Sequence, residues 1–319
     1  MAIKTRKIGI VGVGNVGSHV GFSLATQAEV DELILIDINK TKAEGEALDL
    51  ADAVSFLPHR ISVRAGEYSD CADCDIVVIS AGPLPGMKQS RLDTLGDTIS
   101  VLKDNNTLDS IVESGFDGIF VCISNPADVI ADYVRKKTGF PKERVFSTGT
   151  TLDSSRLKRA LARELKVSEK SIGAYSLGEH GGSQMVPWSH VTIGGKSLLE
   201  LIKEKPEKYG RLNLDAIQEE TRFSGYTVLG GKGSTEFGIS SGLTDIVKAI
   251  YHDEHRVLTV SAYLDGEYNQ RGIHISVPVI LGKDGIEEII ELNLTEEEKK
   301  LFDKSCDVVR EYIALADKI

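Results

Sequence analysis

The first half of the chain alternates between short apolar runs and amphipathic stretches. The apolar runs are continuous and rich in β-branched residues, which is typical of strands covered on both faces. They are Lys7–Val13, Glu32–Ile38, Asp75–Ser80 and Gly118–Ile123. Helix-like segments lie between and after them, at Asn15–Gln27, Thr41–Val54, Leu92–Ser114 and Ala127–Lys137. Because strands that alternate with helices pair in parallel through right-handed crossovers, the pattern predicts an α/β fold with a doubly wound parallel sheet.

The second half of the chain has a different pattern. Candidate helices lie at Ser154–Leu165, Leu214–Leu229 and Gly242–His252, a strand-like segment at Ser171–Leu177, and the two arms of a β-hairpin at Val257–Leu264 and Ile273–Leu281. A last helix is expected after Thr295, because Thr295 and Glu298 have the spacing of a capping box. We therefore predict two domains: a doubly wound domain over residues 1–148, and a mixed α+β domain over residues 149–319 that handles the substrate.

The composition is that of an acidic globular protein. The 319 residues are 41% hydrophobic and carry a net charge of −11, so a nucleic acid or an anionic membrane surface would be repelled. No apolar run approaches the roughly 20 residues that cross a bilayer, and the N-terminal segment lacks the apolar core of a signal peptide. These features predict a cytoplasmic protein with no nucleic-acid and no membrane partner. The cysteines show no disulfide framework and predict free thiols; they are Cys71, Cys74, Cys122 and Cys306.

A glycine-rich segment, Gly12-Val13-Gly14-Asn15-Val16-Gly17, follows the first predicted strand and opens the first helix. The first glycine permits a tight turn, the second lets the backbone approach a pyrophosphate, and the third lets the helix pack closely on the strand. The N–H groups of the helix N-terminus then bind the diphosphate. Asp37 ends the second strand, where a carboxylate accepts hydrogen bonds from a ribose and repels a 2′-phosphate. We therefore predict a Rossmann domain that binds NAD in preference to NADP.

Several polar residues suit the reduction of a 2-keto acid, which needs a cation for the carboxylate, a proton donor near neutral pH and a positive group beside the carbonyl. His180 stands in a glycine-rich segment, although a lone histidine is as often structural. Asp153 and Arg156 share one face at the start of a helix, or form only an intrahelical ion pair. Arg91 follows a glycine- and proline-rich stretch in the position of an active-site lid, or is a solvated charge.

The whole chain resembles the L-lactate and malate dehydrogenase family, and within it most closely the L-lactate and L-2-hydroxyisocaproate dehydrogenases. Seven motifs carry the resemblance, in the family's order and spacing. They are GVGNVG at 12–17, LIDIN at 35–39, AG…SRLD at 81–93, ISNPAD at 123–128, GTTLDSSRL at 149–157, GEHG at 178–181 and KGSTEFGI at 232–239. The resemblance implies an NAD-dependent L-2-hydroxyacid dehydrogenase, with reduction of pyruvate to L-lactate in fermentation as the expected reaction.

The resemblance also implies the catalytic roles. His180 is the proton donor and acceptor, and Asp153 orients it and stabilises the imidazolium. Arg156 binds the substrate carboxylate, while Arg91 enters on a closing loop and polarises the carbonyl.

The remaining site residues are binding residues by the same resemblance. Asn125 hydrogen-bonds the substrate oxygen and helps to place the nicotinamide, and Thr235 lines the pocket. The expected cofactor-binding set is Gly12, Gly14, Asn15, Val16, Gly17, Asp37, Ala81, Gly82 and Asn125.

Four positions depart from the family pattern. Pro85 stands where lactate enzymes typically carry Gln and malate enzymes Arg, and no alignment of this loop supplies an Arg for a second carboxylate, which disfavours malate. Pro85 and Met87 keep a bulkier substrate, 2-ketoisocaproate, as the alternative. Lys158 and Gly173 replace the Arg and His of relatives that fructose 1,6-bisphosphate activates, and Gly182 replaces a usual Asp.

Metal ions and partner chains complete the expectations. No metal-ligand set stands out, and His252 and His255 are interpreted as part of a solvated helix end. The segment Thr41–Val54 resembles the family's dimer-contact helix, which implies a homo-oligomer, either a dimer or a tetramer. A non-catalytic NAD-binding module is a further alternative, although such a module would need no proton relay.

Overall fold

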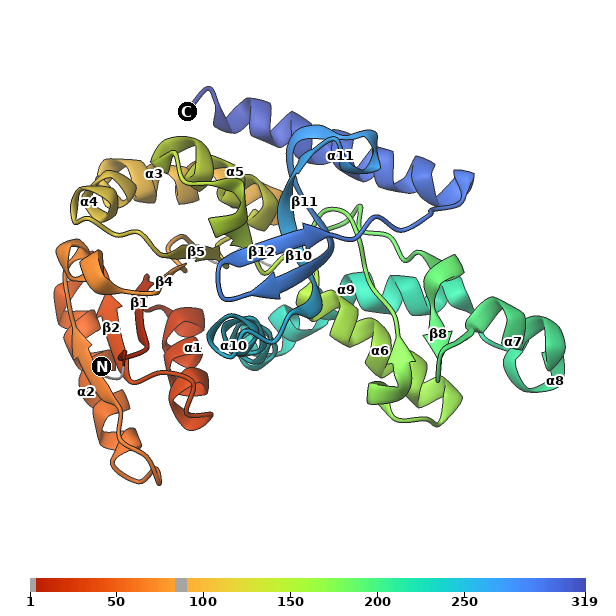
Figure 1. Cartoon of the computed structure of the whole chain (residues 1–319), viewed down its shortest axis with the longest axis horizontal. Helices are drawn as coiled ribbons and strands as arrows, with labels where there is room; N and C mark the ends of the chain where they lie inside the picture. Colours follow the sequence, from red (N-terminus) through yellow and green to blue (C-terminus); the bar gives the residue numbers. More distant parts are fainter. Residues whose placement is uncertain (1–3, 84–90) are drawn as a thin grey trace.

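The computed structural model describes residues 4–83 and 91–319, with only the backbone of Arg91, and is built around a nine-stranded sheet (Figure 1). The first half of the chain contributes β1 (Lys7–Val11), β2 (Glu32–Ile36), β3 (Ser62–Ala65), β4 (Ile76–Ile79), β5 (Ile119–Cys122) and β6 (Val145–Ser147). These strands pair in parallel in the order β6-β5-β4-β1-β2-β3. The chain therefore runs outward from β1 in both directions, which is the doubly wound arrangement that the sequence predicts.

The second half of the chain extends the same sheet. Its strands β10 (Arg256–Asp265), β11 (Arg271–Gly282) and β12 (Gly285–Ile289) are antiparallel, and β10 joins the parallel part where Ser261 pairs with Ser147. A small separate sheet contains β7 (Ile172–Gly173), β8 (Thr192–Ile193) and β9 (Lys196–Ser197). The predicted hairpin and the fold class are thus confirmed, while the domain boundary after residue 148 stays a prediction.

Helices from the two halves pack on each other. The helices of the described residues are α1 (Asn15–Thr26), α2 (Lys40–Val54), α3 (Leu95–Asp104), α4 (Thr107–Glu113), α5 (Ala127–Thr138), α6 (Thr151–Leu165), α7 (Leu198–Glu204), α8 (Pro206–Tyr209), α9 (Leu214–Lys232), α10 (Phe237–Tyr251) and α11 (Glu296–Ala316). The predicted capping box of Thr295 and Glu298 opens α11. From there α11 runs back along the molecule to contact α3 and α5 (Figure 1), and α10 packs against α1.

Three expected elements differ from the structure. The helix expected at Gly242–His252 begins five residues earlier, as α10 (Phe237–Tyr251). The segment 92–114 was expected to form one helix, but it is divided into the 3₁₀ turn η2 (Arg91–Thr94), α3 and α4. The break lies at Asn106, whose φ of +50° is in the left-handed region, which Asn tolerates better than most residues. The segment Ser171–Leu177 forms only β7 and an isolated bridge between Leu177 and Met185. The short strands β3 and β6 escape prediction because β3 is only partly buried and β6 has three residues.

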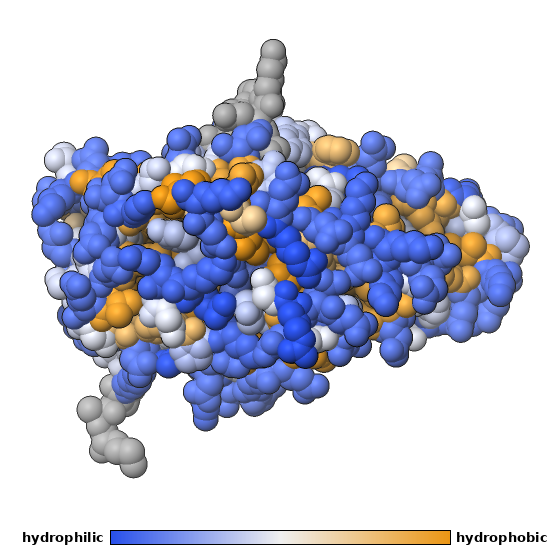
Figure 2. Space-filling model, turned by 90° about the horizontal axis from the view of Figure 1, so that it is seen from above, coloured by the Kyte–Doolittle hydropathy of each residue, from blue (hydrophilic) through white to orange (hydrophobic). Residues whose placement is uncertain are grey.

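Burial follows the parallel arrangement of the sheet. Every residue of β4 and β5 is buried, because the crossover helices cover both faces of a parallel sheet. The four cysteines are free and buried. On the outside, the face in Figure 2 is mainly hydrophilic, with apolar side chains in scattered groups. None of the helices in the described ranges is long and apolar enough to cross a membrane.

Candidate active site

The carboxyl ends of β1, β4 and β5 lie side by side, and each leads into a predicted site segment. After β1, Gly12 takes a φ of +92°, which favours glycine, and a Cβ there would lie 2.6 Å from the backbone nitrogen of Ala81. A Cβ at Gly17 would lie 2.0 Å from the carbonyl oxygen of Gly12. One at Gly14 would meet nothing nearer than Lys42 Nζ at 3.9 Å. Two of the glycines therefore permit close backbone packing, and Gly14 faces open space that a phosphate can enter.

The carboxylate of Asp37 lies against this glycine turn. Its Oδ2 accepts a hydrogen bond from the N–H of Val13 at 3.0 Å, and its Oδ1 accepts one from the N–H of Asn39 at 2.9 Å. Within the described residues, no side chain caps the N-terminus of α1, where Asn15 and Val16 stand. The first N–H groups of a helix have no partner inside the helix, so they and the helix dipole can bind an anion. Diphosphate and ribose of NAD therefore fit this turn.

The turns after β4 and β5 complete this edge of the sheet. Gly82 takes a φ of +128°, and a Cβ there would lie 2.8 Å from Thr98 Oγ1. The carbonyl oxygen of Ala81 accepts a hydrogen bond from Ser124 Oγ at 2.5 Å, and that of Asn125 accepts one from Thr98 Oγ1 at 2.8 Å. The side-chain oxygen Asn125 Oδ1 is buried, with no hydrogen-bond partner in the described part of the chain. An unpaired buried polar atom costs about 1–3 kcal/mol, so this oxygen indicates that a ligand binds beside it.

Asp153 joins the two catalytic candidates of the second half. It is fully buried on α6, and its Oδ1 accepts a hydrogen bond from Arg156 Nη1 at 2.8 Å. Its Oδ2 lies 2.6 Å from Nδ1 of His180, on the loop after β7. The intrahelical ion pair that the sequence left open as an alternative is therefore present, but it is only half of the arrangement. Because Nδ1 is bonded to Asp153, the opposite ring nitrogen, Nε2, is the one that can exchange a proton with a ligand.

These side chains face one small pocket of about 90 Å³. Its described lining residues are Val16, Ile123, Asn125, Ala127, Thr148, Leu152, Arg156, His180, Gly225, Tyr226, Leu229, Ser234, Thr235 and Ile239. The lining is mainly apolar, with a guanidinium, an imidazole and an amide that converge on the same space. An apolar pocket with a few convergent polar groups is typical of a small-molecule site, and its size suits a ligand of a few heavy atoms.

The structure describes every predicted site residue except for the side chain of Arg91, whose role stays a prediction. Arg91 begins η2, but its side chain lies outside the described residues, as do Pro85 and Met87. Conversely, the sequence does not predict the lining residues Gly225, Tyr226, Leu229 and Ile239 of α9 and α10. Tyr226 and Leu229 lie three residues apart on one face of α9, but the same spacing is typical of core contacts, so it carries no signal of its own.

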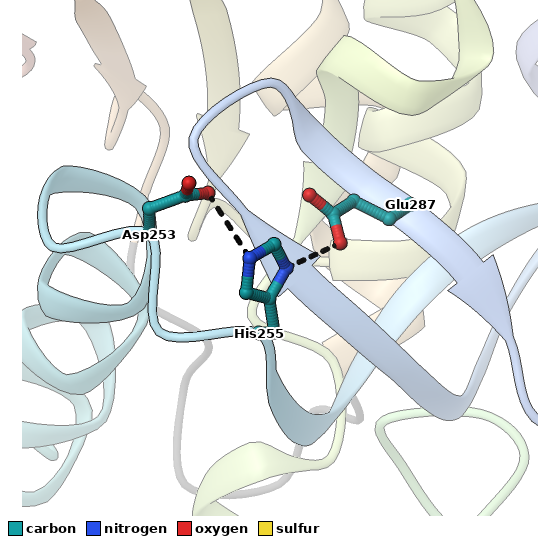
Figure 3. A group of neighbouring side chains, drawn as sticks. All are labelled: Asp253, His255 and Glu287. Atoms are coloured by element: carbon teal, nitrogen blue, oxygen red, sulfur yellow. Dashed lines mark hydrogen bonds and ion pairs between the residues drawn. The ribbon is translucent and has the colours of Figure 1, made fainter.

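One group outside this pocket has the composition of a metal site. Asp253, His255 and Glu287 bring one ligand atom each to within 4.8 Å of one another (Figure 3). The imidazole, however, lies between the carboxylates, with Nδ1 at 2.7 Å from Glu287 and Nε2 at 3.7 Å from Asp253. The hydrogen bond to Glu287 raises the pKa of His255. Ion pairing of an imidazolium with two carboxylates therefore accounts for this group without a metal.

Comparison with family models identifies the chain. Residues 6–147 match the model of the lactate/malate dehydrogenase NAD-binding domain, and residues 150–318 match that of the α/β C-terminal domain. The chain belongs to the lactate/malate dehydrogenase family. It is an NAD-dependent dehydrogenase, and NAD is its cofactor, as the glycine turn and Asp37 predict.

Individual relatives agree over nearly the whole chain. L-lactate dehydrogenase 3 of Bacillus anthracis is 50% identical over 309 residues, 97% of this chain and 97% of the relative. L-lactate dehydrogenase of Fusobacterium nucleatum is 43% identical over 311 residues, 98% of this chain and 97% of the relative.

Solved structures share the fold. The minor L-lactate dehydrogenase of Enterococcus mundtii, in its ligands-bound form, superposes with a TM-score of 0.92 at 38% identity and covers 98% of both chains. A malate dehydrogenase of Cryptosporidium parvum superposes with a TM-score of 0.91 at 27% identity, over 99% of this chain and 100% of the other. The backbone therefore superposes almost equally well on a lactate and on a malate dehydrogenase, so the fold alone does not distinguish the two activities.

Proposed function

We propose that this protein is an L-lactate dehydrogenase that reduces pyruvate to L-lactate with NADH. The observation that carries the proposal is the shared carboxylate of Asp153, which holds Arg156 and His180 against one small pocket. A cation for the substrate carboxylate and a proton donor for the carbonyl oxygen are groups that this reduction requires. The likeness to curated L-lactate dehydrogenases over nearly the whole chain supports the same reaction.

Arg156 would bind the carboxylate of the substrate. A planar guanidinium matches a carboxylate through two parallel N–H···O bonds, and Arg156 is only 6% exposed, so these bonds would form in a poorly solvated site. The hydrogen bond from Nη1 to Asp153 Oδ1 restricts how the guanidinium can turn. The substrate would therefore bind in one orientation, with its carbonyl toward His180.

Proton transfer would belong to His180. NADH, when bound, supplies the hydride that reduces the 2-keto carbon. The carbonyl oxygen gains charge as that carbon is reduced, and His180 would donate a proton to it from Nε2, while Asp153 at Nδ1 keeps the ring in position. Asn125 would hydrogen-bond the same oxygen and Arg91 would polarise it, in the roles that the family resemblance implies. Thr235 would be part of the pocket wall.

The pocket lining favours a substrate with one carboxylate and a small side chain. Among the described lining residues, Arg156 and His180 are the only ones that can be cationic, so a second carboxylate, as in oxaloacetate, would find no partner there. Leu229 and Ile239 provide apolar surface instead. The second candidate reaction is reduction of bulkier apolar 2-keto acids such as 2-ketoisocaproate, which the same apolar wall would accept.

In the cell, the proposed reaction takes place in the cytoplasm and regenerates NAD during fermentation.

We also propose that the protein is a homo-oligomer, a dimer or a tetramer. Phe22 of α1 is 47% exposed and Leu48 of α2 is 66% exposed, and a second copy would bury such side chains. Light scattering during size-exclusion chromatography tests this proposal, and a monomer at micromolar concentration would contradict it.

The proposed reaction is tested by the loss of NADH absorbance with pyruvate, 2-ketobutyrate, 2-ketoisocaproate and oxaloacetate. The expected result is the highest kcat/KM for pyruvate, whereas a maximum at 2-ketoisocaproate would favour the second candidate. A folded protein that binds NADH but reduces none of them would instead be a non-catalytic module. Fructose 1,6-bisphosphate should activate the enzyme weakly or not at all, because Lys158 keeps the charge but lacks the guanidinium fork and Gly173 has no side chain. Clear activation would contradict this expectation.

A further inference from the structure

A buried carboxylate on α5 contacts the main chain of the catalytic histidine and has no role in the reaction as derived so far. Asp128 stands in the first turn of α5 and is 2% exposed. Its Oδ2 accepts a hydrogen bond from the backbone N–H of His180 at 2.8 Å. Its Oδ1 lies 3.4 Å from Ser276 Oγ of β11. Burial raises the pKa of Asp128, and the hydrogen bond from the His180 N–H favours its charged form, so this contact offsets part of the cost of burying the carboxylate.

The contact belongs to a series along the loop that carries the imidazole. The N–H of Gly178 donates to the main chain of β11 at 3.0 Å. The N–H of Glu179 donates to Ser305 Oγ of α11 at 2.8 Å. The N–H of His180 donates to Asp128 of α5. Three successive N–H groups therefore bind three different elements, and the catalytic residue is the one held by a carboxylate.

His180 is thus held at two points. Asp153 on α6 binds the ring at Nδ1, 2.6 Å away, and Asp128 on α5 binds the backbone nitrogen, 2.8 Å away. With both ends of the residue fixed, the position of Nε2 is fixed as well. If the backbone contact is lost, the ring can stay bonded to Asp153 while Nε2 shifts. Displacements of about 1 Å from the reactive geometry cost on the order of a hundredfold in rate.

We propose that Asp128 is a positioning residue: its carboxylate holds the backbone N–H of His180 and thereby sets the distance from Nε2 to the substrate oxygen. The inference rests on the reaction proposed above. Asp128 is not among the described residues that line the pocket, so it acts through His180 and not on the substrate. Its loss should therefore slow the chemical step and leave substrate and cofactor binding nearly unchanged.

The same helix offers a matched control. Asp132 lies one turn further along α5, is 1% exposed and is also a buried carboxylate. Its partners are His274 Nδ1 at 3.2 Å and Lys136 Nζ at 2.9 Å, away from the catalytic loop. Variants of Asp132 therefore report what the loss of a buried carboxylate of α5 does to stability, without the contact to His180.

The experiment compares Asp128→Ala, Asp128→Asn, Asp132→Ala and Asp132→Asn with the wild type. Single-turnover rates of pyruvate reduction are measured with NADH and with NADH deuterated at the transferred position, together with KM, NADH affinity and Tm. Asp128→Ala should lower the rate about 30- to 100-fold and raise the isotope effect, with KM and NADH affinity within about threefold. Asp128→Asn, which keeps a neutral acceptor, should lose about three- to tenfold. Both Asp132 variants should lower Tm but keep the rate within about threefold.

Other results of this comparison would contradict the proposed role of Asp128. Equal reduction rates in the Asp128 and Asp132 variants would overturn the inference. Equal losses of rate in Asp128→Ala and Asp128→Asn would overturn it as well, because the rate would then depend on the charge of Asp128 and not on its hydrogen bond to His180. If Asp128→Ala does not fold, the two Asn variants decide: a rate loss confined to Asp128→Asn supports the inference, and equal rates refute it. A wild type that reduces no 2-keto acid would instead refute the proposed function itself.

Discussion

Replacement of Arg156 by Lys tests the carboxylate-binding site most directly. Lys keeps the positive charge but lacks the planar fork that binds a carboxylate at two points. Each charge-assisted hydrogen bond of the fork is worth about 1.5–3 kcal/mol. Asp153 Oδ1, which lies 2.8 Å from Nη1 in the wild type, would compete for the single ammonium. We therefore expect most of the two-point contact to be lost, about 3–5 kcal/mol.

This loss corresponds to a fall in kcat/KM from roughly a hundredfold to several thousandfold, at about 1.4 kcal/mol for each factor of ten. Steady-state kinetics with pyruvate should show a large rise in KM together with a fall in kcat. Arg159→Lys is the matched control, because Arg159 is an exposed arginine on the same helix. Near-native kinetics of Arg156→Lys would refute the reasoning and leave Arg156 as an ion-pair partner of Asp153. Equal losses in both variants would point to a general disturbance of α6.

Three further changes test the cofactor site and a buried ion pair. Asp37→Ser should weaken NADH binding and improve the use of NADPH, because the repulsion of a 2′-phosphate is removed; equal use of both cofactors by the wild type would contradict this role. Gly17→Ala should lower Tm and NADH affinity, because its Cβ would lie 2.0 Å from a backbone oxygen. For Asp132, burial raises the pKa, but a histidine and a lysine partner outweigh it and hold the pKa below its usual value. Because the pKa of Asp132 is lower in the folded protein than in the unfolded chain, the charged carboxylate stabilises the fold. This stabilisation is complete above the unfolded pKa of about 4 and is lost as the pH falls through the folded pKa. The stability difference between wild type and Asp132→Asn, from urea unfolding, should therefore shrink as the pH falls below about 5, and a constant difference would argue against the ion pair.

Local sequence determined those parts of the protein whose cause is local. The buried strands β1, β2, β4 and β5 follow from continuous apolar runs, and the turn after β1 follows from glycines that allow backbone atoms to approach closely. The capping box at Thr295 is formed within four consecutive residues, so the start of α11 can be read from the sequence alone. Periodicity alone was insufficient between residues 92 and 114, because a helical spacing of apolar residues does not reveal that Asn106 turns the chain.

Tertiary structure decided how the candidates meet. Nothing in the local pattern around Asp153 distinguishes a surface ion pair from a carboxylate that also binds His180, 27 positions away. The contact of Asp128 with the same histidine spans 52 positions and has no signature in either segment. Likewise, the single pairing of Ser261 with Ser147 joins the hairpin to the parallel sheet, although both segments are readable separately. Spacing along the chain fixes which side chains share a face of one helix or strand, but contacts between elements depend on how the sheet order and the packing of α5, α6 and α11 bring distant segments together.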